Sequence, residues 1–148
     1  MFSTKYAQLA KRLPSWLYKL GAQAWIDYEY PRHIFIETTS NCNLTCSYCP
    51  REKRSESMEF GLFKEIIDEA SHYGPRSFSL HLFGEPFLYE RWEDAVSYIK
   101  AKNSKHTVLL TTNGTRINTY IDRIVKSPID KILWTWRKEA RFKPETKE

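Results

Sequence analysis

The feature that most constrains the fold is a regular alternation of strand-like and helical stretches across most of the 148-residue chain. Strand patterns occupy residues 33–38, 77–82, 107–112 and 131–136. Apolar residues recur at helical spacing between them, within residues 63–73, 92–99 and 117–125. Strand–loop–helix repeats of this kind predict βα units with parallel strands and right-handed crossovers. We therefore expect an α/β fold, with helices on one side of a curved sheet or on both sides of a flat one.

The flanking segments differ in character from this core. Residues 1–30 carry apolar side chains at helical spacing, interrupted at Pro14, and we expect a helical extension packed on the outside of the domain. Residues 31–136 form the expected core domain. Residues 137–148 are highly charged and have no strand signal, so we expect a disordered or truncated tail.

Composition excludes several classes of protein. The net charge of +5 is dispersed over both ends of the chain, which argues against a nucleic-acid partner. No stretch approaches the roughly 18 apolar residues of a membrane span, and the first residues lack the apolar core of a signal peptide. We therefore expect a globular cytoplasmic protein.

The cysteines are the most informative residues for function. Cys42, Cys46 and Cys49 are the only three in the chain, and they lie in one loop directly after the first predicted strand. Three clustered thiols in a cytoplasmic chain indicate metal binding rather than disulfides. A Cys-x3-Cys-x2-Cys loop can hold three corners of an iron–sulfur cluster and leave one iron without a protein ligand, whereas electron-transfer clusters normally use four cysteines.

A zinc site is the competing interpretation. Zinc would need a fourth ligand, such as a histidine, and none of the four histidines lies at a typical finger spacing from the cysteines. The alternative function is a small zinc-stabilised α/β binding module with a basic surface for nucleic acid. Ligand count and spacing favour the iron–sulfur cluster.

Each unusual motif follows a predicted strand. The cysteine loop follows the first strand, Gly84-Glu85-Pro86 the second, and Asn113-Gly114 the third. Loops after parallel strands emerge at the same edge of the sheet, where α/β folds place their active sites. We therefore expect these loops to form one site.

At this point the chain resembles a known family. The Cys-x3-Cys-x2-Cys loop, with aromatic Tyr48 before Cys49, is similar to the signature of the radical S-adenosylmethionine (SAM) enzymes, and the resemblance runs from about residue 31 to residue 127. It implies that Cys42, Cys46 and Cys49 bind a [4Fe–4S] cluster whose fourth iron chelates SAM. One electron then cleaves SAM to methionine and a 5′-deoxyadenosyl radical, which abstracts hydrogen from a substrate.

The resemblance also implies cofactor-binding roles for residues after the later strands. Gly84, Glu85 and Pro86 match the family's Gly-Gly-Glu-Pro motif, which contacts the SAM amino group, although Phe83 replaces the first glycine. Thr112 and Asn113 would line the SAM pocket, and Thr135 would lie near the ribose. Tyr48 would shield the cluster or touch the bound cofactor. No catalytic residue is assigned.

The family's core resembles a six-stranded partial barrel, whereas four strands are predicted here. We therefore expect the N-terminal part of a radical SAM core, either a fragment or a half-barrel completed by a partner, and four strands alone do not establish full turnover. The resemblance further implies a one-electron reductant such as a flavodoxin or ferredoxin. It leaves the substrate unidentified.

Overall fold

The computed structural model describes residues 16–17, 30–51, 55–135 and 141–142. The chain divides into two units, residues 1–32 and residues 33–148, and the second holds everything described below. The predicted helical extension over residues 1–30 lies almost entirely outside the described residues.

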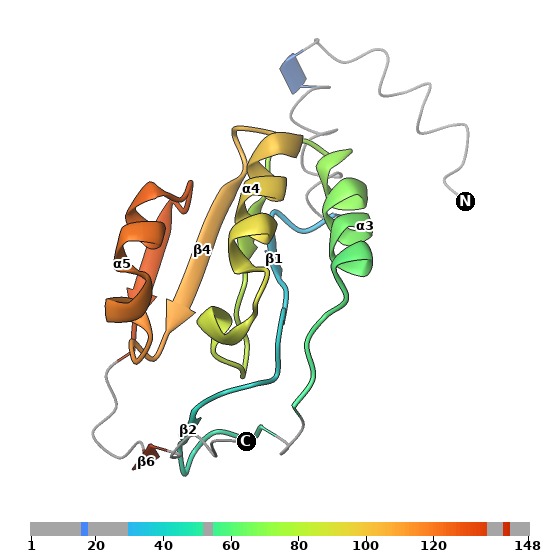
Figure 1. Ribbon diagram of the computed structural model, residues 1–148. Coiled ribbons are helices and arrows are strands. Elements are labelled where there is room, and N and C mark those ends of the chain that lie inside the picture. Colours follow the sequence, from blue (N-terminus) through green and yellow to red (C-terminus); the bar gives the residue numbers. More distant parts are fainter. Residues whose placement is uncertain (1–15, 18–29, 52–54, 136–140, 143–148) are drawn as a thin grey trace. The chain divides into compact units, whose positions relative to one another are not determined.

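A four-stranded parallel sheet forms the centre of the second unit (Figure 1). Its strands are β1 (His33–Phe35), β3 (Ser77–Ser79), β4 (Thr107–Thr112) and β5 (Lys131–Trp134), and they lie side by side in chain order. The predicted α/β class and all four strands are confirmed. Three of the four strands are shorter than predicted, because the chain leaves the ladder near its carboxyl end to form the loops of the site.

The helices α3 (Phe60–Ser71), α4 (Trp92–Lys102) and α5 (Ile117–Lys126) cover one face of this sheet (Figure 1). Right-handed crossovers between strands in sequential order place every helix on the same side. Of the two arrangements left open by the sequence, the one with all helices on one side of the sheet is therefore adopted.

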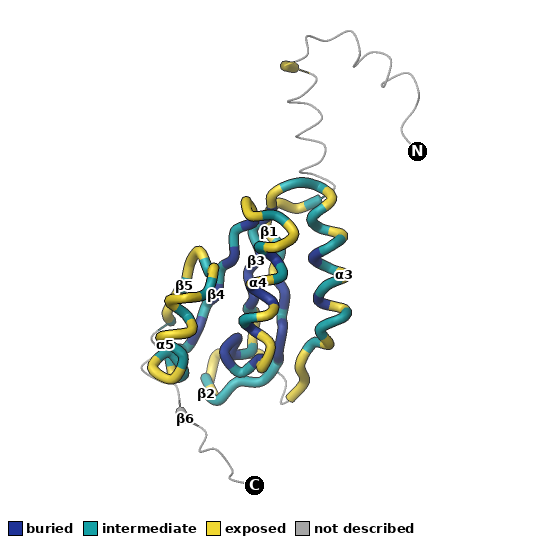
Figure 2. The backbone as a smooth tube through the Cα atoms, turned by 45° about the horizontal axis from the view of Figure 1, so that its top comes forward, coloured by how far each residue is buried: buried dark blue, intermediate teal, exposed yellow. Residues whose placement is uncertain are grey.

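The core lies between the sheet and the helices, where the buried positions of Figure 2 concentrate. Alternate residues of β4 point into it, with Val108 and Leu110 fully buried and their neighbours partly exposed. α5 has no buried residue and leaves Val125 75% exposed, so its apolar face is only partly covered.

A second, two-stranded antiparallel sheet joins the cysteine loop to the end of the chain. It pairs β2 (Leu44–Thr45) with β6 (Arg141–Phe142). The sequence carries no strand signal in residues 137–148, so β6 departs from the expected tail. A two-residue strand is too short for a periodic pattern, and its pairing depends on a partner about a hundred residues away.

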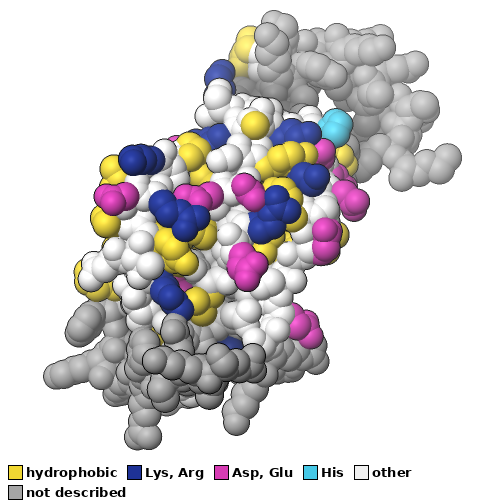
Figure 3. All heavy atoms as spheres, viewed as in Figure 1, with side chains coloured by type: hydrophobic (Ala, Val, Ile, Leu, Met, Phe, Trp, Pro, Cys, Tyr) yellow, Lys and Arg dark blue, Asp and Glu magenta, His cyan; other side chains and the backbone are white. Residues whose placement is uncertain are grey.

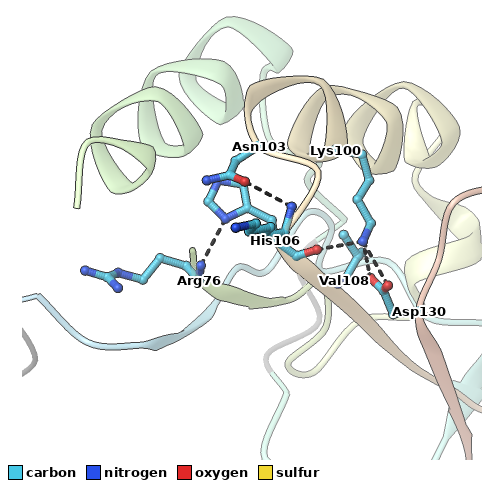
Figure 4. A network of polar contacts seen from close by, with 7 residues as sticks. Arg76, Lys100, Asn103, His106, Val108 and Asp130 are labelled. Atoms are coloured by element: carbon cyan, nitrogen blue, oxygen red, sulfur yellow. Dashed lines mark hydrogen bonds and ion pairs between the residues drawn. The ribbon is translucent and has the colours of Figure 1, made fainter. Parts of the chain in front are cut away.

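A network of polar contacts lies at the amino ends of β3 and β4, at the end of the sheet opposite the loops of the site (Figure 4). The His106 side chain is 1% exposed, and its Nδ1 accepts the backbone N–H of Arg76 at 3.0 Å. Its Nε2 lies 2.9 Å from the hydroxyl of Ser71. Lys100 donates to the His106 carbonyl oxygen and pairs with Asp130, which accepts the N–H of Val108. These contacts require a neutral His106 with its proton on Nε2.

We therefore expect acid to destabilise the fold through His106. Burial lowers the pKa of His106 below its ordinary value of 6.5, so the unfolded chain binds the proton more tightly. His106 contributes its full stability above pH 6.5 and loses it as the pH falls through its lower folded pKa, with a slope of at most about 1.4 kcal/mol per pH unit. Urea unfolding from pH 7.5 to 5 should show a steeper loss in the wild type than in His106→Gln. Equal slopes would contradict this assignment.

The surface seen in Figure 3 mixes basic and acidic side chains. Ion pairs join Arg91 to Asp94, Lys100 to Asp130, Lys102 to Asp68 and Arg123 to Glu93. In these four pairs, each basic side chain is matched by an acidic one. Within the described residues, no helix is both long and apolar enough to cross a membrane.

Candidate functional site

A cavity of about 320 Å³ lies at the carboxyl ends of the strands. Nine of the ten residues predicted from the sequence line it: Tyr48, Gly84, Glu85, Thr112, Asn113, Thr135 and the three cysteines, Cys42, Cys46 and Cys49. The tenth, Pro86, is buried and begins the short helix η1 (Pro86–Leu88). The expectation that the loops after the strands meet at one site is met by this geometry.

Gly84 brings the loop after β3 against the backbone of the cysteine loop. A Cβ at this position would overlap the carbonyl oxygen of Thr39 and lie 2.8 Å from its carbonyl carbon. The next residue, Glu85, donates its N–H to the carbonyl oxygen of Asn41 at 2.7 Å. Only glycine permits this approach, which occurs although Phe83 replaces the first glycine of the family motif.

Glu85 ties the loops together from inside the protein. Its side chain is 1% exposed, and one carboxylate oxygen accepts the hydroxyl of Thr112 at 2.6 Å. The other accepts the N–H of Asn113 at 2.8 Å. Burial raises the pKa of Glu85, and these donors, with the N–H of Phe87, partly offset that effect. The carboxylate therefore bridges the loops after β3 and β4, while its predicted contact with SAM stays a prediction.

The loop after β4 is fixed by glycine and by β5. Gly114 has φ +82°, and a Cβ there would overlap the indole of Trp134. Thr135 approaches the same loop, because its N–H and its hydroxyl both donate to the carbonyl oxygen of Thr112, at 2.9 and 3.2 Å. Thr112, Asn113 and Thr135, which were predicted to line the SAM pocket, thus lie together, each held by contacts to its neighbours.

The three thiols share the cavity but differ in surroundings. Burial raises the pKa of Cys42, and the nearby carboxylate of Glu85 acts in the same direction. The N–H of Leu44, the side chain of Arg51 and the amide of Asn113 act against it. Metal binding would deprotonate the thiol despite its raised pKa, because the positive metal ions favour the thiolate.

The geometry offers no support for a zinc site. Within the described ranges, no group of three His, Cys, Asp or Glu side chains is arranged to hold a single metal ion. Among the histidines only His81 lines the cavity, and both of its ring nitrogens contact Thr111: Nδ1 accepts the backbone N–H at 3.2 Å and Nε2 lies 3.0 Å from the hydroxyl. A fourth zinc ligand would have to break these contacts.

Arg51 and His81 line the cavity although they were not predicted as site residues. Arg51 donates to the carbonyl oxygen of Ser40 at 3.1 Å, which places its positive charge beside the thiols. Arg51 lies two residues after Cys49, so its place next to the cysteine loop could have been noticed in the sequence. His81 is the second-to-last residue of the second predicted strand, close to the edge where the site is expected.

Comparison with known proteins identifies relatives of this chain. The family model described as "Radical SAM superfamily" matches residues 36–133. A probable GTP 3′,8-cyclase of Methanococcus maripaludis is 30% identical over 105 residues, which cover 68% of this chain and 35% of that protein.

Solved structures give the same relationship. The structure of BtrN with AdoMet and 2-DOIA superposes with a TM-score of 0.67 at 25% identity, covering 76% of this chain and 48% of that one. SuiB of Streptococcus suis bound to S-adenosylmethionine has a TM-score of 0.57 at 26% identity, and the match covers 70% of this chain and 25% of that one. The chain spans from about a quarter to about half of the length of these relatives.

The residues present suit the cofactors that members of this family bind, a [4Fe–4S] cluster and SAM. Three soft thiolates from one loop are the ligand type of iron–sulfur clusters. A cluster assigns each thiolate to a separate iron, so its ligands do not need the tight convergence of a single-ion site. The cavity continues past the thiols to Gly84 and Thr135, on the loops expected to meet SAM.

Proposed function

The chain belongs to the radical SAM superfamily, and from this we propose that Cys42, Cys46 and Cys49 hold a [4Fe–4S] cluster with one iron open to SAM. We assign this role to a partial core domain spanning residues 31–136. The observation that carries the proposal is the single cavity lined by all three thiols and by the loops after β3, β4 and β5.

The chain's own residues would bind and orient the cofactors. The three thiolates would hold the cluster, and Gly84 lets the loop after β3 approach the cysteine loop closely. Glu85 holds this loop against Thr112 and Asn113 through hydrogen bonds to its two carboxylate oxygens. Side chains of this buried set position the loops, so that SAM meets a preformed surface.

Tyr48 and Thr135 lie at the periphery of the same cavity. Tyr48 is 51% exposed, which suits an aromatic side chain that shields the cluster from solvent or touches the cofactor. Thr135 lines the cavity from the end of β5, where the SAM ribose would lie.

When bound, the cluster would supply one electron that breaks a C–S bond of the SAM sulfonium, which gives methionine and a 5′-deoxyadenosyl radical able to take a hydrogen atom from a substrate. A flavodoxin or ferredoxin is the class of protein that would deliver this electron, and the cytoplasm is the compartment that would contain it. The substrate is left unassigned, because the chain covers 35% of the cyclase and 48% of BtrN.

Reductive cleavage of SAM tests the proposal. Protein reconstituted anaerobically with iron and sulfide, then reduced with dithionite, should form methionine and 5′-deoxyadenosine in equal amounts from added SAM. Cys46→Ala, treated in the same way, should form neither above background. Cluster-loaded wild type that yields no more of either product than this variant would overturn the proposed function.

A further inference from the structure

Three polar side chains form a closed ring between the cysteine loop and the loop after β4. Asn113 donates through Nδ2 to Oδ1 of Asn43 at 3.0 Å, and Asn43 donates through Nδ2 to the hydroxyl of Thr115 at 2.8 Å. The hydroxyl of Thr115 then donates back to Oδ1 of Asn113 at 2.7 Å. Each hydroxyl and amide in the ring thus has a defined donor or acceptor role.

The ring fixes the orientation of the Asn113 amide. Its Oδ1 also accepts the backbone N–H of Thr115 at 3.0 Å, so exchanging the oxygen and nitrogen would set two N–H groups against each other. The amide nitrogen has two hydrogens, and only one is needed by Asn43. The other is directed at Sγ of Cys42, 3.7 Å from Nδ2.

We propose that Asn113 is a positioning residue whose amide donates a hydrogen bond to the Cys42 thiolate and thereby raises the reduction potential of the cluster. This inference rests on the proposed function. One-electron reduction adds a negative charge that spreads onto the sulfur ligands, and a donor aimed at a sulfur stabilises the more negative state.

The contact joins the loop after β4 directly to a proposed cluster ligand. Nδ2 of Asn113 lies 3.7 Å from Sγ of Cys42, which is partly buried. The backbone N–H of Asn113 is separately held by Glu85, which keeps this contact when the amide is removed. Asn113→Ala should therefore remove the donor, together with the Oδ1 contacts to Thr115, without breaking the contact between the two loops at Glu85.

The test is a dithionite redox titration of the reconstituted cluster, followed by electron paramagnetic resonance (EPR) in the absence of SAM. At a fixed potential near the wild-type midpoint, Asn113→Ala should lower the ratio of reduced to oxidised cluster about tenfold, equivalent to about 59 mV for one electron. Asn113→Asp should lower it further, because a carboxylate oxygen replaces the donor. Asn118→Ala, an exposed asparagine of α5, is the matched control and should not change the ratio.

The outcomes separate this inference from the proposed function. Asn113→Ala with full iron and sulfide content and an unchanged midpoint would overturn it. If Asn113→Ala does not assemble a cluster, Asn113→Asp supplies the test, since its carboxylate can keep the contacts with Thr115 but has no N–H to donate, and it should lower the midpoint in the same direction. An unchanged midpoint in Asn113→Asp would then overturn the inference. Failure of the wild type to assemble a cluster would instead refute the proposed function.

Discussion

Gly84→Ala should separate the loop after β3 from the cysteine loop and destabilise the fold by about 3 kcal/mol or more. The added methyl group would overlap backbone atoms of Thr39 and lie 3.1 Å from the carbonyl oxygen of Asn41. Backbone atoms cannot rotate aside as a side chain can, so the loss of stability should reach or exceed the ~1–3 kcal/mol that is usual for overpacking. Urea unfolding of the protein without cofactors measures this change directly.

Gly61→Ala is the matched control for this substitution. Gly61 lies in the first turn of α3, and a Cβ there would meet only the side chain of Glu59, whose flexible end can move. Alanine also favours a helix over glycine by up to about 1 kcal/mol. Because moving Glu59 would weaken its N-cap contact with the N–H of Leu62, the two effects oppose each other, and the control should stay within about 1 kcal/mol of the wild type. A Gly84→Ala protein as stable as the Gly61→Ala protein would contradict the close approach described for Gly84.

Cys46→Ala should abolish cluster assembly. The chain has three cysteines, so removing one leaves two thiolates for a cluster that already lacks a fourth protein ligand. Protein reconstituted under anaerobic conditions should lose nearly all of its bound iron and sulfide, together with the visible absorbance of the cluster. Iron and sulfide analysis of the desalted protein measures the loss.

Ser47→Ala is the control for this experiment, because Ser47 is exposed in the same loop and lines no part of the cavity. It should bind as much iron and sulfide as the wild type. Full iron and sulfide content in Cys46→Ala would show that the ligand assignment is wrong. Stoichiometric zinc without iron in the wild type would revive the zinc-stabilised binding module.

Much of the fold and of the site could be predicted from the sequence. The four strands and three helices each carry their own apolar period, so local pattern sufficed to place them. The cysteine loop and the residues around Gly84 and Asn113 could be assigned to one edge, because parallel strands place the loops that follow them together. The family resemblance rested on the same residues and is confirmed by the match over residues 36–133.

The polar contacts within the site could not be predicted. Glu85 was expected to face SAM, yet its oxygens bind Thr112 and Asn113, which lie 27 and 28 residues further along the chain. The contact of Asn113 with Cys42 spans 71 residues. The period of the apolar residues indicates which face of a helix or strand is buried, but it does not indicate which polar groups in different loops contact each other. The pairing of β2 with β6 was missed for the same reason.

The open iron is the central claim, and the EPR spectrum of the reduced cluster tests it most directly. Spectra of the reconstituted, dithionite-reduced protein should be recorded with and without SAM under otherwise identical anaerobic conditions. Binding of SAM to an iron without a protein ligand predicts a clear change in the g-values of the cluster signal. A cluster signal that stays the same at saturating SAM would contradict the account.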